Sequence, residues 1–322
     1  YLGIAVSRRN VSRFLTILGK SAFVGGMKAF VFSTFLFVFC TALQASDFAE
    51  TKKLAEAGDV AAQYNFGLMH FEGDGVIKDH KLAAKWFDRA AEGGLAKAQY
   101  NLGVMYSLGI GVIKNKKLAI ELYTKAADQG EAVAQYNLGN IYANDDVVVK
   151  NYKLAAKWFD RAAKQGHVKA QYSLGKMYED GKGVIENDKL AVELYTKAAK
   201  GGSVFAQNAI GRKYLIGEGV IMDKKIAAEW YTMAAKQGDA DSQYFVGLMY
   251  FKGDGVIEDF VRSYAWLSNA KTNGDKNAPE AIELLKKSMT KEQIAIGQAL
   301  AQKLFNEIEN RDEESPVNFK YD

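Results

Sequence analysis

The stretch Ala98-Gln99-Tyr100-Asn101-Leu102-Gly103-Val104-Met105-Tyr106 opens a 36-residue segment that decides the fold, because the segment occurs six times without a gap. The copies cover residues 62–277 of a chain of 322. Self-similarity at such a period is the signature of a protein built from stacked repeats. The six units begin at Ala62, Ala98, Ala134, Ala170, Ala206 and Ser242.

Each unit contains two stretches with the apolar spacing of a helix. The first stretch places Ala98, Leu102, Met105 and Tyr106 on one face, at the i, i+4, i+7, i+8 spacing. The second has its apolar stripe at unit positions 22, 25, 26, 29 and 30. One such pair cannot bury its own stripes, whereas stacked pairs share a continuous core. The sequence therefore predicts an all-α fold, an α/α superhelix (solenoid) of 36-residue helix-turn-helix repeats.

Three further unit positions carry local signals. Position 18 is always Asp or Asn, which predicts an N-cap for the second helix. Position 33 is always glycine, which suits the left-handed residue that ends a helix. Glycine at position 6 lies within the first helix and predicts close approach of a neighbouring helix. The position 18 residues are Asp79, Asn115, Asn151, Asn187, Asp223 and Asp259, and the position 33 residues are Gly94, Gly130, Gly166, Gly202, Gly238 and Gly274.

Taken with the turn Gly109-Ile110-Gly111-Val112 and the ending Lys125-Ala126-Ala127-Asp128-Gln129-Gly130, the units resemble Sel1-like repeats. These are bacterial relatives of the tetratricopeptide repeat. The stretch from Tyr264 to Ala295 is similar to the terminal unit and closing helix of exported members. The resemblance implies a binding scaffold of the bacterial periplasm or exterior. The third unit departs from the pattern, since it has Asp145-Asp146-Val147 in place of Gly-x-Gly, and its turn is expected to differ in shape.

Residues 1–45 are interpreted as a signal peptide region. A basic start at Met27-Lys28 precedes the apolar stretch Ala29–Phe39, and small residues suited to cleavage end at Ala45. We expect translation to start at Met27 and export to the periplasm or the exterior. Behind this region the sequence predicts an N-terminal capping helix over 46–61, the repeats over 62–277, C-terminal capping helices over 278–308 and a flexible acidic tail over 309–322. A twin-arginine signal and an uncleaved anchor are the alternatives.

The sequence contains few residue patterns of the kind that catalysis or metal binding requires. The single cysteine, Cys40, lies in the signal region, and His70, His80 and His167 share no metal-binding or triad spacing. The Gly-x-Gly turns lack the further glycine and lysine of a phosphate-binding loop. We therefore expect no cofactor, no metal and no enzyme activity.

Two Ser-x-x-Lys matches, Ser173–Lys176 and Ser288–Lys291, keep an alternative open. Some relatives have been described as β-lactamases or penicillin binders, so a cell-envelope hydrolase acting on β-lactams or peptidoglycan is the competing hypothesis. The partner motifs Ser-Asp-Asn and Lys-Thr-Gly of such enzymes are absent. A purely structural envelope protein is the other alternative.

The predicted binding surface is a row of side chains on the first helices. If these helices line the concave side, as in tetratricopeptide arrays, unit positions 3, 7, 10 and 11 face inward. A row of tyrosines offers amphipathic contact of the kind enriched at interfaces, although tyrosines that only pack between repeats would give the same row. The predicted partner-binding residues are Tyr64, Tyr100, Tyr136, Asn140, Tyr172, Lys176, Arg212 and Tyr244.

Charge restricts the class of partner. The formal net charge is +4, and five basic residues ahead of Ser46 account for the excess, so the repeat region is close to neutral. Nucleic-acid binding needs a basic face, which this region lacks. We expect a protein or peptide partner, no nucleic acid, no stable membrane insertion of the mature chain, and a monomer.

Overall fold

The computed structural model describes the backbone of residues 47–144 and 148–314. Within these ranges the burial of side chains is described up to residue 310. All regular structure in these ranges is helical, which confirms the all-α prediction. The chain divides into two compact units, one ending at Leu122 and the other starting at Tyr123. Unit 1 contains a helix over residues 47–56, α3 (Val60–Glu72), α4 (His80–Glu92), α5 (Ala96–Leu108) and the first half of α6 (Lys116–Asp128).

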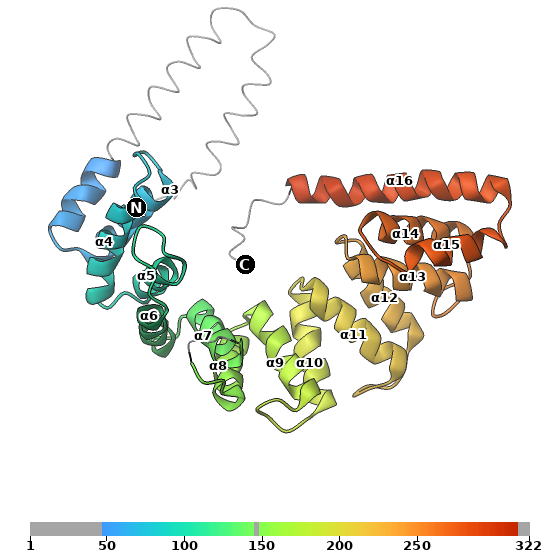
Figure 1. Ribbon diagram of the computed structural model, residues 1–322, viewed down its shortest axis with the longest axis horizontal. Helices are drawn as coiled ribbons and strands as arrows, with labels where there is room; N and C mark the ends of the chain where they lie inside the picture. Colours follow the sequence, from blue (N-terminus) through green and yellow to red (C-terminus); the bar gives the residue numbers. More distant parts are fainter. Residues whose placement is uncertain (1–46, 145–147, 315–322) are drawn as a thin grey trace, which may run out of the picture. The chain divides into compact units, whose positions relative to one another are not determined.

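Unit 2 contains the rest of α6 and ten further helices. Its helices are α7 (Ala132–Asn144), α8 (Tyr152–Lys164), α9 (Val168–Asp180), α10 (Asp188–Lys200), α11 (Val204–Ile216), α12 (Lys224–Ala235), α13 (Ala240–Lys252), α14 (Phe260–Thr272), α15 (Ala278–Lys286) and α16 (Lys291–Glu314). From α7 to α14 each first helix packs on the second helix of its repeat, and each second helix packs on the next first helix (Figure 1). The long helix α16 lies along α14.

The predicted caps form. The side chain at position 18 accepts a hydrogen bond from the backbone three residues on in all six repeats, as in Asn187 to the N–H of Leu190 at 3.1 Å. The glycine at position 33 has a positive φ in every repeat, between 84° and 97°. Both signals are local, so spacing along the chain was enough to predict them.

Glycine at position 6 permits the close helix approach that the sequence predicted. A methyl group placed on Gly67 would lie 2.8 Å from the ring of Phe87, and one on Gly175 would lie 2.9 Å from the ring of Tyr195. These rings belong to the second helix of the same repeat. An alanine at this position would overlap them, so the packing offsets the cost of glycine inside a helix.

The second glycine of the Gly-x-Gly turn forms a contact between repeats. In four repeats a side chain there would collide with the carbonyl group that begins the second helix of the preceding repeat. On Gly219, for example, a methyl group would lie 2.6 Å from the carbonyl oxygen of Asp188. In these four repeats the turn therefore packs directly against the preceding repeat.

A glutamine at position 2 joins consecutive repeats, and the sequence interpretation missed it. In five repeats this side chain is buried, and its amide donates to the backbone carbonyl of an alanine in the preceding second helix. The Nε2–O distances run from 3.0 Å for Gln135 to 3.2 Å for Gln99 and Gln171. In Gln135 and Gln207 the amide oxygen also accepts from a second glutamine 30 residues on. Because the amide nitrogen of each of these buried glutamines is hydrogen-bonded, this contact between repeats does not leave that donor unpaired.

Three predicted boundaries need correction. The N-terminal helix stops at residue 56, because Gly58 with φ 96° ends it and Asp59 caps α3 with a 2.7 Å hydrogen bond from Ala62. Residues 60–61 thus belong to the first repeat. At the other end, α16 continues to Glu314, so residues 309–314 of the predicted tail are helical. The segment Glu307–Glu314 is rich in glutamate, which favours helix.

The C-terminal helices close the core of unit 2. Gly297 of α16 lies against the ring of Tyr264, and Asn269 of α14 donates to the carbonyl of Ala301 at 3.2 Å. Ile308 packs with Trp266 in the last apolar cluster. The predicted signal region, the turn Asp145–Val147 and residues 315–322 lie outside the described residues.

Candidate binding surface

The predicted binding residues lie at unit positions 3 and 7 of the first helices, and we call positions 3, 7, 10 and 11 together the first-helix surface. Six of the eight predicted residues are half-buried, and the other two, Lys176 and Arg212, are exposed, so their partner-binding role stays a prediction. The half-buried residues are Tyr64, Tyr100, Tyr136, Asn140, Tyr172 and Tyr244.

The tyrosines at position 3 both pack and present their edges. The ring of Tyr64 lies 5.6 Å from that of Phe87, and its hydroxyl accepts from the amide of Asn101 at 3.3 Å. Tyr172 lies 5.6 Å from Tyr195 in the same way. Each ring covers an aromatic residue of the second helix and remains partly exposed. These rings therefore pack between helices, and their exposed edges are compatible with partner binding, which stays a prediction.

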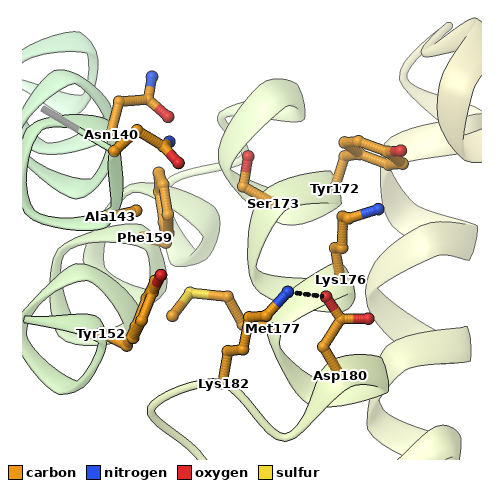
Figure 2. A pocket seen from close by; sticks show the side chains of 11 residues that line it. Asn140, Ala143, Tyr152, Phe159, Tyr172, Ser173, Lys176, Met177, Asp180 and Lys182 are labelled. Atoms are coloured by element: carbon orange, nitrogen blue, oxygen red, sulfur yellow. Dashed lines mark hydrogen bonds and ion pairs between the residues drawn. The ribbon is translucent and has the colours of Figure 1, made fainter. Parts of the chain in front are cut away.

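A groove opens between α7, α8 and α9 within unit 2, with a volume of about 280 Å³. Six of its eleven lining residues come from positions 3, 7, 10 and 11 of two successive first helices. Figure 2 shows Asn140 on one side of it and Ser173 and Lys176 of α9 on the other. The lining residues are Asn140, Ala143, Asn144, Tyr152, Phe159, Tyr172, Ser173, Lys176, Met177, Asp180 and Lys182.

The floor of this α7–α9 groove is apolar and its rim is polar. Phe159, Met177 and Ala143 are buried beneath it. On the rim, Lys182 pairs with Asp180 at 2.8 Å (Figure 2). Lys176 has no ion-pair partner among the described residues. The groove therefore combines apolar contact area with one positive charge that has no ion-pair partner in the described part of the chain.

Next to the groove, a cluster of charged side chains fills the space between α9, α10 and α11. Lys213, only 1% exposed, donates to Glu179 at 2.9 Å, to Asp188 at 2.8 Å and to Glu218 at 2.9 Å. Glu179 also pairs with Arg212 and accepts from the hydroxyl of Tyr195 at 2.7 Å. We call these residues, with Tyr195, the α9–α11 charge cluster.

Titration shifts follow from these contacts. Burial raises the pKa of the Glu179 carboxyl, but hydrogen bonds from Tyr195 and Lys213 and the nearby positive charges outweigh it, so this pKa lies below its usual value. Burial lowers the pKa of Lys213, and its three carboxylate partners raise it well above its usual value. Burial, together with the hydrogen bond to Glu179, raises the pKa of Tyr195. At neutral pH Glu179 and Lys213 are therefore ionised, and Tyr195 is protonated.

The sequence interpretation missed Lys213, although a signal was present. It stands at unit position 8, where Met69, Met105, Met177 and Met249 occupy the core stripe of other repeats. A lysine in place of a buried methionine predicts carboxylate partners nearby. Which carboxylates pair with Lys213 depends on how consecutive repeats pack. Arg212, predicted as a partner contact, is held by Glu179 instead of standing free.

Acidification below about pH 6.5 is expected to destabilise α9 through His167. Its Nδ1 accepts from the N–H of Ala170 at 3.2 Å, which only an unprotonated nitrogen can do. Burial and then Lys169 lower the pKa of His167 below its usual 6.5. The unfolded chain thus takes up a proton at higher pH than the folded chain. Stability is complete above about pH 6.5 and falls as the pH drops toward the folded-state pKa.

Denaturant unfolding of the wild type and of His167→Asn at about pH 7.5 and pH 5 checks this. Asparagine keeps an N-cap acceptor that does not titrate, so the variant is expected to lose less stability on acidification. The difference is expected to reach at most about 1 kcal/mol, the contribution of one N-cap. Equal losses in both proteins would contradict the assignment.

The Sel1 repeat family model matches six consecutive segments of the chain, at residues 60–95, 96–131, 132–167, 168–203, 204–239 and 240–275. The chain belongs to the Sel1 repeat family. Count and period agree with the predicted units, and only the frame differs, by two residues. The family frame begins at Val60, the first residue of α3.

Solved structures support the assignment. A Sel1 repeat protein from Oxalobacter formigenes is 33% identical, with a TM-score of 0.59, over 70% of this chain and 99% of that one. The protein c5321, a protective antigen present in uropathogenic Escherichia coli strains that displays an SLR fold, is 27% identical, with a TM-score of 0.55, over 84% of this chain and 67% of that one. None of the curated proteins matches. Sel1 repeat proteins generally act as protein-interaction scaffolds.

The candidate catalytic side chains of this Sel1 repeat protein give limited support to an enzyme activity. Ser173 and Lys176 both line the α7–α9 groove, but Figure 2 shows their polar atoms pointing in different directions. Within the described ranges no hydrogen bond joins them. His70 is buried between Phe48 and Phe66, with neither ring nitrogen hydrogen-bonded to a described residue. The same ranges contain no group of three potential metal ligands and no helix with the length and hydropathy of a membrane span.

Proposed function

We propose that this Sel1 repeat protein is an exported scaffold that binds a protein or peptide on the first-helix surface, the predicted concave face of the superhelix. The α7–α9 groove supports the proposal most directly. Its apolar floor and polar rim resemble protein interfaces, which have an apolar centre surrounded by a polar rim. Tyr172 and Asn140 add an aromatic edge and an amide without a described partner. Envelope or host proteins are the expected partners.

Export is supported by the signal-like sequence before Ser46, and a protective antigen is among the similar structures. Expression of the full chain in a bacterium, followed by fractionation and sequencing of the exported N-terminus, tests it. A mature chain that begins at Ser46 is expected. Retention of the uncleaved chain in the cytoplasm would contradict export and leave the binding proposal intact.

Binding is tested by capture from envelope and host-secreted protein extracts with residues 46–322. Ser173→Arg is expected to fill the groove, and Lys176→Glu to reverse its free charge. Arg212 is left unchanged, because Glu179 holds it within the charge cluster. The matched control is Lys200→Glu, on an exposed lysine at the end of α10. All variants are first checked for unchanged helicity and thermal unfolding.

A partner held by the wild type and by Lys200→Glu, and lost with both groove variants, would support the proposal. Equal capture by all four proteins would move the site away from the groove. Absence of any partner would favour the purely structural alternative. The hydrolase alternative is tested with a chromogenic β-lactam, and sustained turnover that disappears in Ser173→Ala would replace the scaffold by an enzyme.

A further inference from the structure

The residue at position 7 has different neighbours in two successive repeats of unit 2. Position 7 carries a positive charge in both, as Lys176 in the fourth repeat and Arg212 in the fifth. Arg212 is paired with Glu179, which stands at position 10 of the repeat before it. The equivalent of Glu179 for Lys176 is Ala143. Among the described residues, no carboxylate therefore stands in the α7–α9 groove at the place that Glu179 occupies in the α9–α11 charge cluster.

The space left by that difference is the groove itself. Ala143, which is 9% exposed, lines it together with Lys176. The shorter side chain thus removes a carboxylate and leaves a space of about 280 Å³ at the same place. A group that enters from another molecule can supply both the volume and the charge.

The remaining polar groups of the groove favour an anionic, hydrogen-bond-accepting ligand. Asn140, Asn144 and Ser173 have side chains that can donate and have no hydrogen-bond partner among the described residues. Asp180 is already paired with Lys182 at 2.8 Å. Lys176 is then the one charged group of the lining without a described counterion. A carboxylate complements it, because ammonium–carboxylate hydrogen bonds are stronger than neutral ones.

The floor restricts the ligand further. Phe159 and Met177 lie beneath the groove, and Tyr172 stands on its edge. These side chains offer apolar contact to a residue beside the carboxylate. A single lysine is too little charge for a polyanion such as nucleic acid, which requires several phosphate contacts. A peptide segment with an apolar residue next to an acidic group fits both features.

Resting on the proposed function, we infer that the α7–α9 groove binds a peptide segment whose carboxylate takes, beside Lys176, the place that Glu179 takes beside Arg212. The carboxylate comes from an aspartate or glutamate side chain or from a C-terminus. Asn140 and Ser173 hold the adjacent polar groups, and the apolar neighbour lies on Phe159 and Met177.

Methionine methyl NMR on residues 46–322 tests this inference. Met177 lines the groove, and Met249 stands at the same unit position two repeats on, where it serves as the internal control. Three short probe peptides are compared. The first has blocked ends and a central Leu-Glu-Tyr sequence, the second replaces its glutamate by glutamine, and the third keeps the glutamine but has a free C-terminal carboxylate after the tyrosine. The first and third probes distinguish the two sources of the carboxylate.

At least one carboxylate probe is expected to shift the Met177 methyl signal and leave Met249 unchanged. The blocked glutamine probe is expected to bind about tenfold more weakly, as for loss of a charged hydrogen bond. Lys176→Gln is expected to weaken the carboxylate probes by a similar factor, and the control Lys200→Gln to leave them unchanged. Ala143→Glu is expected to abolish binding because it supplies both the volume and the carboxylate internally, whereas Ala143→Gln supplies the volume alone and is expected to weaken binding less.

Equal binding of the glutamate and blocked glutamine probes would overturn the inference. So would the absence of any Met177 shift with both carboxylate probes, or full binding by Ala143→Glu. Failure here is distinguishable from failure of the proposed function. A captured partner that is lost with Ser173→Arg but unaffected by Lys176→Gln and Ala143→Glu would keep the scaffold and reject the carboxylate.

Discussion

Replacement of Lys213 by alanine is expected to lower the free energy of unfolding by about 3 kcal/mol, because removal of one member of a buried ionic cluster leaves its partners uncompensated. The ammonium group is 1% exposed and contacts three carboxylates within 2.9 Å. Glu179 keeps its ion pair with Arg212 and its hydrogen bond from Tyr195 in this variant. Denaturant unfolding followed by circular dichroism measures the loss.

Lys213→Met separates charge from packing, since methionine occupies this position in four other repeats. We expect Lys213→Met to be destabilising alone and to recover in part when Glu179→Gln is added, because the second change removes a charge that the first leaves with Arg212 as its one described ion-pair partner. Glu179→Gln alone is expected to destabilise the wild type. Additive effects in this double-mutant cycle would show that the two side chains are not coupled.

The matched control is Lys164→Met on the exposed pair with Asp160, at 2.6 Å. Surface ion pairs contribute little, and this variant is expected to leave stability almost unchanged. Acid provides a second check. The pKa of Glu179 lies below its usual 4.5, so its contribution is complete above about pH 4.5 and is lost as the pH falls toward the folded-state value. The effect of Lys213→Met should shrink over that range.

Gly255→Ala is expected to cost about 2–5 kcal/mol of stability, through two effects at one position. Its φ of 73° is unfavourable for any residue with a Cβ, at about 1–2 kcal/mol. The added methyl group would also collide with the carbonyl of Lys224 and lie 2.7 Å from the backbone nitrogen of Lys225. Overpacking of this kind typically costs about 1–3 kcal/mol.

Gly274→Ala is the matched control in the same repeat. Its φ is 94°, and nothing lies within 4 Å of the position of an added Cβ. The control therefore carries the backbone cost alone, and the difference between the two variants measures the contact between the fifth and sixth repeats. Thermal and denaturant unfolding give both values. Equal destabilisation by the two substitutions would mean that the turn does not seat one repeat on the next.

Sequence spacing alone predicted most of the fold. The period, the helix pairs, the caps at Asn187 and its equivalents and the helix-ending glycines depend on residues within one repeat. Such signals are local, so they can be read from the order of residues. The ends were less well predicted, because Gly58 and the helix-favouring segment before Glu314 shifted boundaries by a few residues.

The candidate site was predicted in part. Six of the eleven residues that line the α7–α9 groove come from positions 3, 7, 10 and 11, because helical periodicity fixes which side chains share a face. The sequence by itself therefore determined the repeat and its helices, and the partner-binding role of the first-helix surface stays a prediction. Only the tertiary structure decided that Glu179 pairs with Arg212 and Lys213, and that Lys176 and Ala143 both line the α7–α9 groove. These contacts join side chains some 30 residues apart, and their geometry depends on how consecutive repeats pack.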